Sequence, residues 1–294
     1  MKIAIAGSSG LIGQALVDSL REDGHEVLRL VRRPSVAATE VTWDPDSGTI
    51  DLEKLVGTQI LINLAGAGVG DRRWSKKYKN LIHSSRVNST RTISKVATQI
   101  KPEVLINASA IGWYGDTSDR EVNENAPVGH GFLAEVVRDW EAETRIAQDA
   151  GIRVVRIRTG LVVAKNGGAW AKLLPIFKLG FGGKLGSGKQ YWSFISLRDE
   201  IAAIKFLIAN PQISGPVNLT APNPATNSQV TKAMGKVFRR PTFFLVPAFI
   251  LKLVLGEFSI EVLGSTRVKP SVLLDHGFVF SDPEITSALR TLTK

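Results

Sequence analysis

Three glycines near the N-terminus, Gly7, Gly10 and Gly13, follow a short apolar run and precede an amphipathic stretch with helical spacing. In such a turn the first glycine permits a tight bend, the second lets the backbone approach a pyrophosphate, and the third lets helix and strand pack closely. The N–H groups and the dipole at the start of the helix attract phosphate oxygens. The spacing therefore predicts a dinucleotide-binding loop, with a plain glycine-rich turn as the alternative. The predicted contacts from this loop are Gly7, Ser9, Gly10, Leu11, Ile12 and Gly13.

The next strand-like run ends at two arginines, Arg32 and Arg33. A carboxylate at this place would accept hydrogen bonds from the adenosine 2′-hydroxyl of NAD, whereas an arginine pairs with a 2′-phosphate. The two arginines therefore predict that the cofactor is NADP(H). Two solvated loop arginines remain the alternative.

Composition limits the other kinds of site. The chain has 294 residues, of which 44% are hydrophobic, so it can hold one large α/β domain with a smaller cap. It has no cysteine, which excludes disulfides, thiolate metal sites and a cysteine nucleophile. Its four histidines lie far apart in the sequence, so we predict no metal site.

Charge and hydropathy bear on partners and location. The formal net charge is +10, but the basic residues are spread along the chain. We interpret the densest group, residues 72–79, as a solvated face rather than a nucleic-acid stripe. The longest apolar run, residues 243–255, contains Pro247 and Lys252 and is too short to span a bilayer. We see no secretory signal pattern at the start. We therefore expect a cytoplasmic protein that binds a small anionic molecule, and neither nucleic acid nor membrane.

Apolar runs alternate with amphipathic stretches through the first two thirds of the chain. Each alternation requires a crossover connection between parallel strands buried on both faces. The pattern predicts an α/β protein with a doubly wound parallel sheet, the Rossmann fold. The predicted strands are Ile3–Ala6, Glu26–Val31, Ile60–Leu64, Val104–Ser109 and Val154–Arg158, and the predicted helices are Leu11–Arg21, Lys77–Ile100 and Phe132–Asp149.

After Gly160 the pattern changes to glycine-rich loops and short helices. We interpret Phe194–Ser196 as a strand that returns to the main sheet, Asp199 as the N-cap of a helix, and Gly277–Phe280 as a last strand. A short helix is expected around Trp170–Leu179. We divide the chain into a Rossmann domain, residues 1–164 with 193–220, and an interleaved small C-terminal substrate or lid domain, residues 165–192 with 221–294.

Several further motifs resemble the extended short-chain dehydrogenase/reductase superfamily, which includes NAD-dependent sugar-nucleotide epimerases and dehydratases. Asn63–Gly66 is similar to its cofactor-lining N-x-A-G turn, and Val87–Thr90 is similar to its N-x-x-G-T helix. Ser109 with Trp113–Gly115 resembles the active-site serine strand and the turn after it. Blocks such as Arg158–Val162 resemble the atypical branch called epimerase family proteins, which has a small C-terminal domain. This resemblance implies cofactor contacts from Arg32, Arg33, Leu64, Ala65, Gly66, Arg86, Ser109 and Val162.

The superfamily normally uses a Tyr-x-x-x-Lys pair, in which the tyrosine moves a proton and the lysine lowers its pKa. The chain has three tyrosines, and the residues four places after them are Ile82, Ser118 and Ile195. By order along the chain the pair should fall at Phe132 and Val136, which transfer no proton. The usual mechanism therefore cannot operate unchanged.

Ser109 is the first catalytic candidate, because a hydroxyl there can polarise a substrate oxygen; a structural serine at a strand end is the alternative. Tyr114 is the second, as a replacement acid in the turn that follows. Glu135 and Glu141 fit surface helix positions equally well. The remaining candidate carboxylates are Asp116, Glu121, Glu124 and Asp199.

Three functions fit these observations. The first is an NADP(H)-dependent oxidoreductase or epimerase acting on a small-molecule substrate, for which the resemblance suggests a sugar nucleotide. The second is a non-catalytic NADP(H)-binding sensor or regulatory protein. The third, a nucleic-acid-binding module, depends on charge alone. The resemblance also implies a homodimer.

Overall fold

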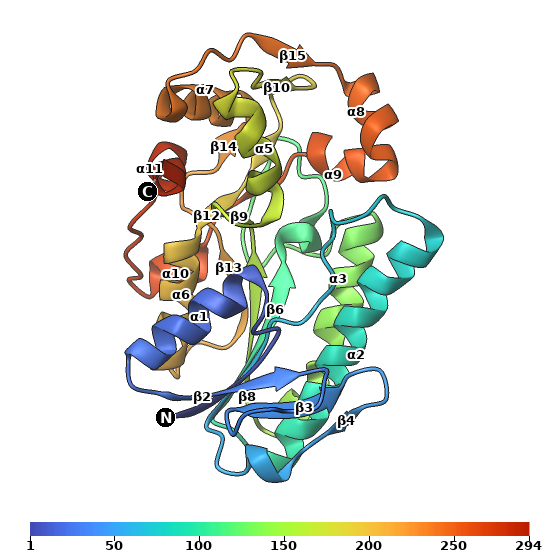
Figure 1. Cartoon of the computed structure of the whole chain (residues 1–294), viewed down its shortest axis with the longest axis vertical. Helices are drawn as coiled ribbons and strands as arrows, with labels where there is room; N and C mark the ends of the chain where they lie inside the picture. The colour runs from blue at the N-terminus through green and yellow to red at the C-terminus, as the bar shows by residue number, and fades with distance from the viewer. Residues whose placement is uncertain (294) are drawn as a thin grey trace.

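The fold is described by a computed structural model that covers residues 1–293. Its centre is a sheet of eight strands in the order β13-β8-β6-β5-β1-β2-β3-β4 (Figure 1). All neighbouring strands are parallel except β3 and β4. The predicted doubly wound parallel sheet is therefore confirmed. The strands are β1 (Lys2–Ala6), β2 (Glu26–Val31), β3 (Glu40–Asp44), β4 (Thr49–Ile50), β5 (Ile60–Asn63), β6 (Val104–Ala110), β8 (Arg153–Thr159) and β13 (Gly215–Leu219).

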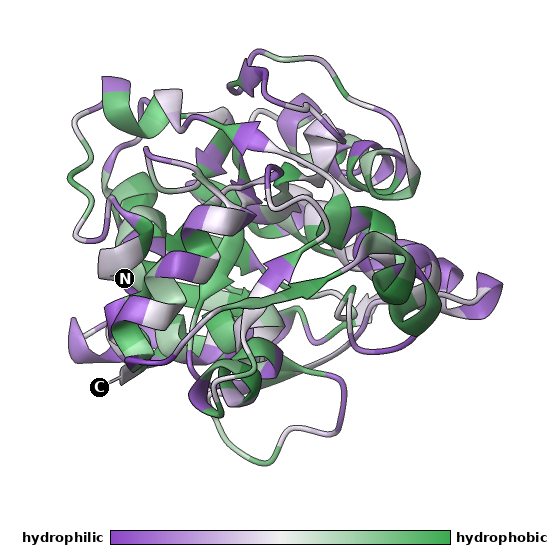
Figure 2. Cartoon of the chain, turned by 90° about the horizontal axis from the view of Figure 1, so that it is seen from above, coloured by the Kyte–Doolittle hydropathy of each residue, from purple (hydrophilic) through white to green (hydrophobic). Residues whose placement is uncertain are grey.

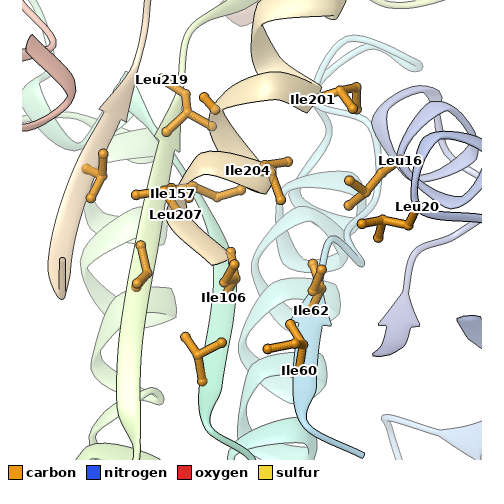
Figure 3. Packing of buried hydrophobic residues seen from close by; sticks show 14 of the residues in the cluster. Leu16, Leu20, Ile60, Ile62, Ile106, Ile157, Ile201, Ile204, Leu207 and Leu219 are labelled. Atoms are coloured by element: carbon orange, nitrogen blue, oxygen red, sulfur yellow. The ribbon is translucent and has the colours of Figure 1, made fainter. Parts of the chain in front are cut away.

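Helices cover both faces of the sheet because its strands are apolar on both sides. In β1, Ile3 and Ile5 join one core cluster, whereas Ala4 and Ala6 join another. Figure 3 shows side chains of α1 and α6 packed against isoleucines of β5, β6 and β8. Figure 2 shows hydrophobic residues gathered at the centre and hydrophilic stripes on the outer helices. The first face is covered by α1 (Leu11–Glu22) and α6 (Leu197–Ala209), and the second by α2 (Lys76–Ile100), α3 (Phe132–Ala142) and α4 (Arg145–Asp149).

The strand order creates a switch point between β1 and β5. The chain leaves β1 toward β2 through α1, whereas β5 continues on the other side of β1 through α2 to β6. Connections that diverge in this way leave a crevice at the carboxyl ends of the two strands, where open α/β sheets bind ligands. Gly7 and Leu64 follow these two ends.

The prediction that Phe194–Ser196 returns to the main sheet is wrong. This strand, β12, pairs with β9 (Leu161–Val163) in a separate two-stranded sheet. The outer edge of β8 is already occupied by β13, which pairs with residues 155–159 of β8.

Most of the shorter elements gather at the carboxyl end of the sheet or beside α6 (Figure 1). Every helix among residues 1–293 is too short or too polar to cross a lipid bilayer. The other strands are β7 (Glu121–Val122), β10 (Gly183–Leu185), β11 (Tyr191–Trp192), β14 (Ala225–Thr226), β15 (Phe244–Val246) and β16 (Arg267–Val268). The other helices are α5 (Gly168–Lys178), α7 (Asn227–Phe238), α8 (Ala248–Leu255), α9 (Ser259–Leu263), α10 (Ser271–Asp275) and α11 (Ile285–Arg290), and 3₁₀ turns cover Glu53–Leu55, Ile111–Tyr114, Gly256–Phe258 and Thr291–Thr293.

Two local expectations are also wrong. Residues 277–280 form no strand; instead the ring of Phe278 lies 5.3 Å from that of Phe206 and 4.8 Å from that of Phe280. Their alternating aromatic pattern therefore reflects packing rather than strand pairing. The N-cap of α6 is Ser196, whose Oγ accepts a hydrogen bond from the amide of Asp199.

Candidate active site

A cleft of about 430 Å³ lies at the carboxyl ends of the central strands, between the glycine loop and the first residues of α5. Most of the predicted cofactor residues line it. They are Gly7, Gly10, Leu11, Ile12, Gly13, Leu64, Gly66, Arg86, Ser109 and Val162. Outside its lining lie Ser9, Arg32, Arg33, Ala65 and Tyr114.

The glycine loop has the geometry that its spacing predicts. Gly7 has φ +77°, and a Cβ there would lie 2.5 Å from the carbonyl carbon of Leu64. A Cβ on Gly13 would lie 2.2 Å from the carbonyl oxygen of Gly7. Helix α1 begins after Gly10 without a side-chain cap, so N–H groups of its first turn are available to an anion in the cleft. The loop therefore fits a phosphate group.

A buried polar network shapes the opposite wall. The Asn63 side chain donates to Asn107 Oδ1 at 2.8 Å, and Asn63 Oδ1 accepts from the amide of Ala65 at 3.2 Å. Thr90 Oγ1 donates to the same Asn107 oxygen and accepts from the indole of Trp140 at 2.8 Å. Because these groups are buried and mutually satisfied, they fix the turn at residues 64–66.

Arg86 brings a positive charge into the cleft. It extends from α2, and its guanidinium donates to the carbonyl oxygen of Ile82 at 3.0 Å and lies 5.2 Å from the ring of Trp140. Its side chain also packs on Gly66, where a Cβ would lie 3.3 Å from the Arg86 Cγ. Burial lowers the pKa of Arg86 to about 10, which leaves it charged at neutral pH. Within residues 1–293 Arg86 has no carboxylate partner, and a desolvated cation of this kind favours an anionic ligand.

The two arginines after β2 differ in their surroundings. Arg32 is exposed, whereas Arg33 donates to both carboxylate oxygens of Glu40, at 2.7 and 2.9 Å. Glu40 on β3 is buried and also accepts from Arg29 at 2.8 Å. The hydrogen bond from Arg33 lowers the pKa of Glu40 to about 2. The ion pair with Glu40 thus fixes the position of Arg33, and the sequence analysis did not identify this carboxylate.

Ser109 lines the cleft and is hydrogen-bonded to a buried ion pair. Its hydroxyl donates to Glu141 Oε1 at 2.6 Å. Arg158 donates to both oxygens of Glu141, at 2.8 and 2.9 Å. Glu141 is therefore a buried residue of α3 and not a surface one, whereas Glu135 is exposed. Because its proton is directed at Glu141, Ser109 presents lone pairs to the cleft.

These features agree with comparisons to known proteins. A model of the NAD dependent epimerase/dehydratase family matches residues 3–219. The chain belongs to this family. A second model, described as a domain of unknown function, matches residues 246–292, where the resemblance placed a small C-terminal domain.

Relatives of this family cover almost the whole chain. An epimerase family protein of Mycobacterium bovis is 46% identical over 292 residues, which are 99% of this chain and 97% of the relative. The crystal structure of the human epimerase family protein SDR39U1 with NADPH has a TM-score of 0.90 and 29% identity, and covers 99% of this chain and 98% of that one. A nucleoside-diphosphate sugar epimerase from Corynebacterium glutamicum has a TM-score of 0.81 and 34% identity, and covers 99% of this chain and 58% of that one.

In this family member, Tyr114 does not line the cleft and instead contacts the buried Arg158. Its hydroxyl donates to Asn218 Oδ1 at 2.7 Å and accepts from Arg158 at 3.1 Å. Burial raises the pKa of Tyr114. The tyrosine hydroxyl thus belongs to the network that supports Arg158.

The other candidate carboxylates are also outside the cleft lining. Glu124 accepts from the amides of Asn218 and Val272, and Asp199 accepts from the amides of Ser281 and Asp282. Each of these two carboxylates therefore holds backbone segments that are distant in the sequence next to its own element. The others, Asp116, Glu121 and Glu135, are exposed.

The positions where the superfamily order places Tyr and Lys belong to an apolar cluster. The ring of Phe132 lies 5.0 Å from that of Trp74, and Val136 is buried beside them. Packing therefore fills this part of α3, and neither side chain contributes an ionisable group.

No signal in the sequence pointed to one cleft residue, Thr159, or to the buried glutamate bonded to it. Thr159 lines the cleft at the end of β8 and donates to Glu200 Oε1 at 2.8 Å. Glu200 is fully buried in the first turn of α6, and burial raises its pKa to about 8. From the sequence, this glutamate looks like an acidic residue placed to favour the helix dipole, so no signal distinguished it.

Proposed function

We propose that this family member binds NADP(H) and uses it to oxidise or reduce a hydroxyl or carbonyl carbon of a small polar substrate. The observation that carries this proposal is that the uncapped start of α1, the Arg86 guanidinium and the Ser109 hydroxyl line one cleft. The first two suit phosphate groups, and the third suits a reacting oxygen.

The glycine loop would hold the pyrophosphate, and Leu64, Gly66 and Val162 would line the rest of the cofactor site. Arg32 and Arg33 would hold the 2′-phosphate at the end of β2. The human relative crystallised with NADPH supports the phosphorylated form. When bound, this cofactor supplies or accepts a hydride.

Ser109 would orient the substrate. Because its own proton is engaged by Glu141, its oxygen accepts a hydrogen bond from a substrate hydroxyl. Arg158 forms an ion pair with Glu141 and holds its side chain in place. A sugar nucleotide is the substrate class we favour, because the relative from Corynebacterium glutamicum is called a nucleoside-diphosphate sugar epimerase.

A second candidate function is a non-catalytic NADP(H) sensor. The observation that favours it is the apolar packing of Phe132 and Val136, where the superfamily order predicts the proton-transferring pair. A sensor needs only the cofactor site.

Cofactor selectivity can be tested with Arg32→Ala and Arg33→Ala, separately and together. Each lost charge-assisted hydrogen bond should weaken NADPH binding by about tenfold to a hundredfold and leave NADH binding nearly unchanged. Isothermal titration with both cofactors measures this. Arg29 still pairs with Glu40 in the Arg33 variant, so the fold is expected to persist. Equal losses for NADPH and NADH would contradict the 2′-phosphate assignment.

Catalysis is tested by incubating the protein and NADPH with a panel of sugar nucleotides and carbonyl compounds. Nicotinamide absorbance and sugar products are followed, with Ser109→Ala as the site variant and the exposed Ser47→Ala as its control. Turnover that is lost only in the Ser109 variant supports the enzyme. Tight NADPH binding without turnover on the whole panel supports the sensor.

A further inference from the structure

Ser109 and Thr159 lie at the carboxyl ends of two neighbouring strands, β6 and β8, and line the same cleft. In the register of β6 and β8, Ser109 pairs with Arg158 and Ala110 pairs with Thr159. Each hydroxyl is bonded to a buried glutamate: Ser109 to Glu141 of α3, and Thr159 to Glu200 of α6. The two glutamates therefore approach the cleft from opposite faces of the sheet.

These are the two hydroxyl groups among the side chains that line the cleft in the described chain. The remaining polar lining groups are Arg86, Trp140 and Trp170, and neither a guanidinium nor an indole gives up a proton near neutral pH. The Ser109 proton is already directed at Glu141. Thr159 also donates to a glutamate, but this 2.8 Å hydrogen bond reverses if Glu200 is protonated, because a neutral carboxyl can donate to Thr159 Oγ1. The Thr159 proton is then free for a substrate oxygen.

The environment of Glu200 differs from that of Glu141. Glu141 forms a bidentate ion pair with Arg158, whereas Glu200 Oε1 accepts from Thr159 and Oε2 has no partner within residues 1–293. Burial without a counter-charge favours the neutral acid, in agreement with a pKa of about 8. Of the two glutamates, Glu200 is therefore the one whose surroundings favour a bound proton.

In the part of the chain that the structure describes, the elements around α6 leave Glu200 without a counter-charge. Helix α6 packs mainly against α1, β9 and β12, and neither of these strands contains a charged residue. The charged residues of α1 are exposed, and the nearby ion pairs are complete without Glu200. The exposed charged residues of α1 are Asp18, Arg21 and Glu22. The nearby ion pairs are Asp23–Lys205 and Asp282–Arg198. The Asp199 carboxylate accepts hydrogen bonds from the backbone amides of Ser281 and Asp282.

We propose that Glu200 is the proton source of this active site and that Thr159 passes its proton into the cleft. The step depends on the proposed oxidoreductase function. As a hydride forms the new C–H bond of a substrate carbonyl, the electron pair of the C=O bond moves to the oxygen. That oxygen takes the Thr159 hydroxyl proton, Thr159 takes the Glu200 proton, and Glu200 becomes a carboxylate. The cofactor is oxidised, the carbonyl is reduced to an alcohol, and solvent later returns a proton to Glu200.

The protonation state can be tested without cofactor by difference infrared spectroscopy of the protein alone. At pH 7 the wild-type protein should show a protonated-carboxyl C=O stretch that Glu200→Gln removes and that fades as the pH rises through about 8. Thr159→Val should shift this band because it removes the hydrogen bond to Glu200. Glu124→Gln, which alters another buried carboxyl outside the cleft, is the matched control and should leave the Glu200 band unchanged.

The relay can be tested on kcat/KM for carbonyl reduction by NADPH. Glu200→Gln and Thr159→Val should each lower it by about a hundredfold or more, as expected for loss of general-acid catalysis. Thr159→Ser keeps the hydroxyl and should restore most of the rate. In the wild-type protein kcat/KM should fall as the pH rises above about 8, and Glu200→Gln should lose this dependence.

The outcomes distinguish the relay from the function on which it depends. A wild-type protein that reduces a carbonyl, with the Glu200→Gln and Thr159→Val variants within twofold of it, overturns the relay and leaves the proposed function intact. Absence of the infrared band at pH 7 also overturns it. Absence of turnover in the wild-type protein removes the proposed function and the relay together, whatever the infrared result.

Discussion

The two sides of the sheet hold the same chemical arrangement in opposite electrostatic settings. On the α3 side, a hydroxyl contacts a glutamate that is neutralised by Arg158. On the α6 side, a hydroxyl contacts a glutamate that has no ion pair within residues 1–293. Both glutamates are buried, so what distinguishes them is the counter-charge: Arg158 pairs with Glu141, whereas Glu200 Oε2 has no partner within residues 1–293. Three predictions test this comparison, beginning with the largest expected effect.

Arg158→Met should destabilise the protein most. It leaves Glu141 buried without a cation in direct hydrogen-bond contact, which typically costs about 3–5 kcal/mol in the free energy of unfolding. Urea denaturation at pH 7 measures this. Adding Glu141→Gln should recover much of the loss, because the double variant no longer buries the Glu141 carboxylate without Arg158. A single variant that loses less than about 1 kcal/mol would mean that the Arg158 ion pair is not what stabilises Glu141.

Glu200→Gln should change how stability depends on pH. Below a pH of about 4.5 the Glu200 carboxyl is protonated in both the folded and the unfolded chain. Between about 4.5 and 8 it ionises only when unfolded. Each pH unit in this range should therefore lower the free energy of unfolding of the wild-type protein by about 1.4 kcal/mol relative to the variant.

Urea denaturation of both proteins at pH 5, 6, 7 and 8 checks this. The contributions of other titrating groups cancel in the difference between the two free energies of unfolding. The difference should level off above a pH of about 8, where Glu200 ionises in the folded chain as well. Parallel stability curves would show that Glu200 is already ionised when folded and would remove the contrast with Glu141.

Arg156→Gln should have the smallest effect and is the matched control for Arg158→Met. The Arg156 Nε lies 3.7 Å from Glu141 Oε2, too far for the direct hydrogen bonds that Arg158 makes. We expect a loss below about 1 kcal/mol in the free energy of unfolding, as for a partly exposed ion pair. A loss comparable to that of Arg158→Met would mean that both arginines neutralise Glu141.

The sequence by itself determined those parts of the molecule whose structure depends on residues close together in the chain. The glycine loop was predictable because strand, turn and helix are contiguous, and the bend at Gly7 and the close packing at Gly13 exclude other side chains. Five strands of the parallel sheet were predictable because they are short continuous apolar runs. The other two parallel strands, β3 and β13, were not predicted, because each contains polar residues or a proline. Ser109 and Arg86 were identified through motifs with fixed positions around this loop, and both line the cleft.

Only the tertiary structure decided which carboxylates could take part in chemistry. Glu135 and Glu141 lie on the same helix, yet one is exposed and the other meets Arg158 of β8. Glu200 became a buried acid because α6 packs on the sheet beside Thr159, a contact across 41 positions of the chain. Local sequence patterns predict which residues form a helix. The pKa of a carboxyl, however, depends on solvent exposure and on charges brought from distant segments, which are fixed only when the elements pack.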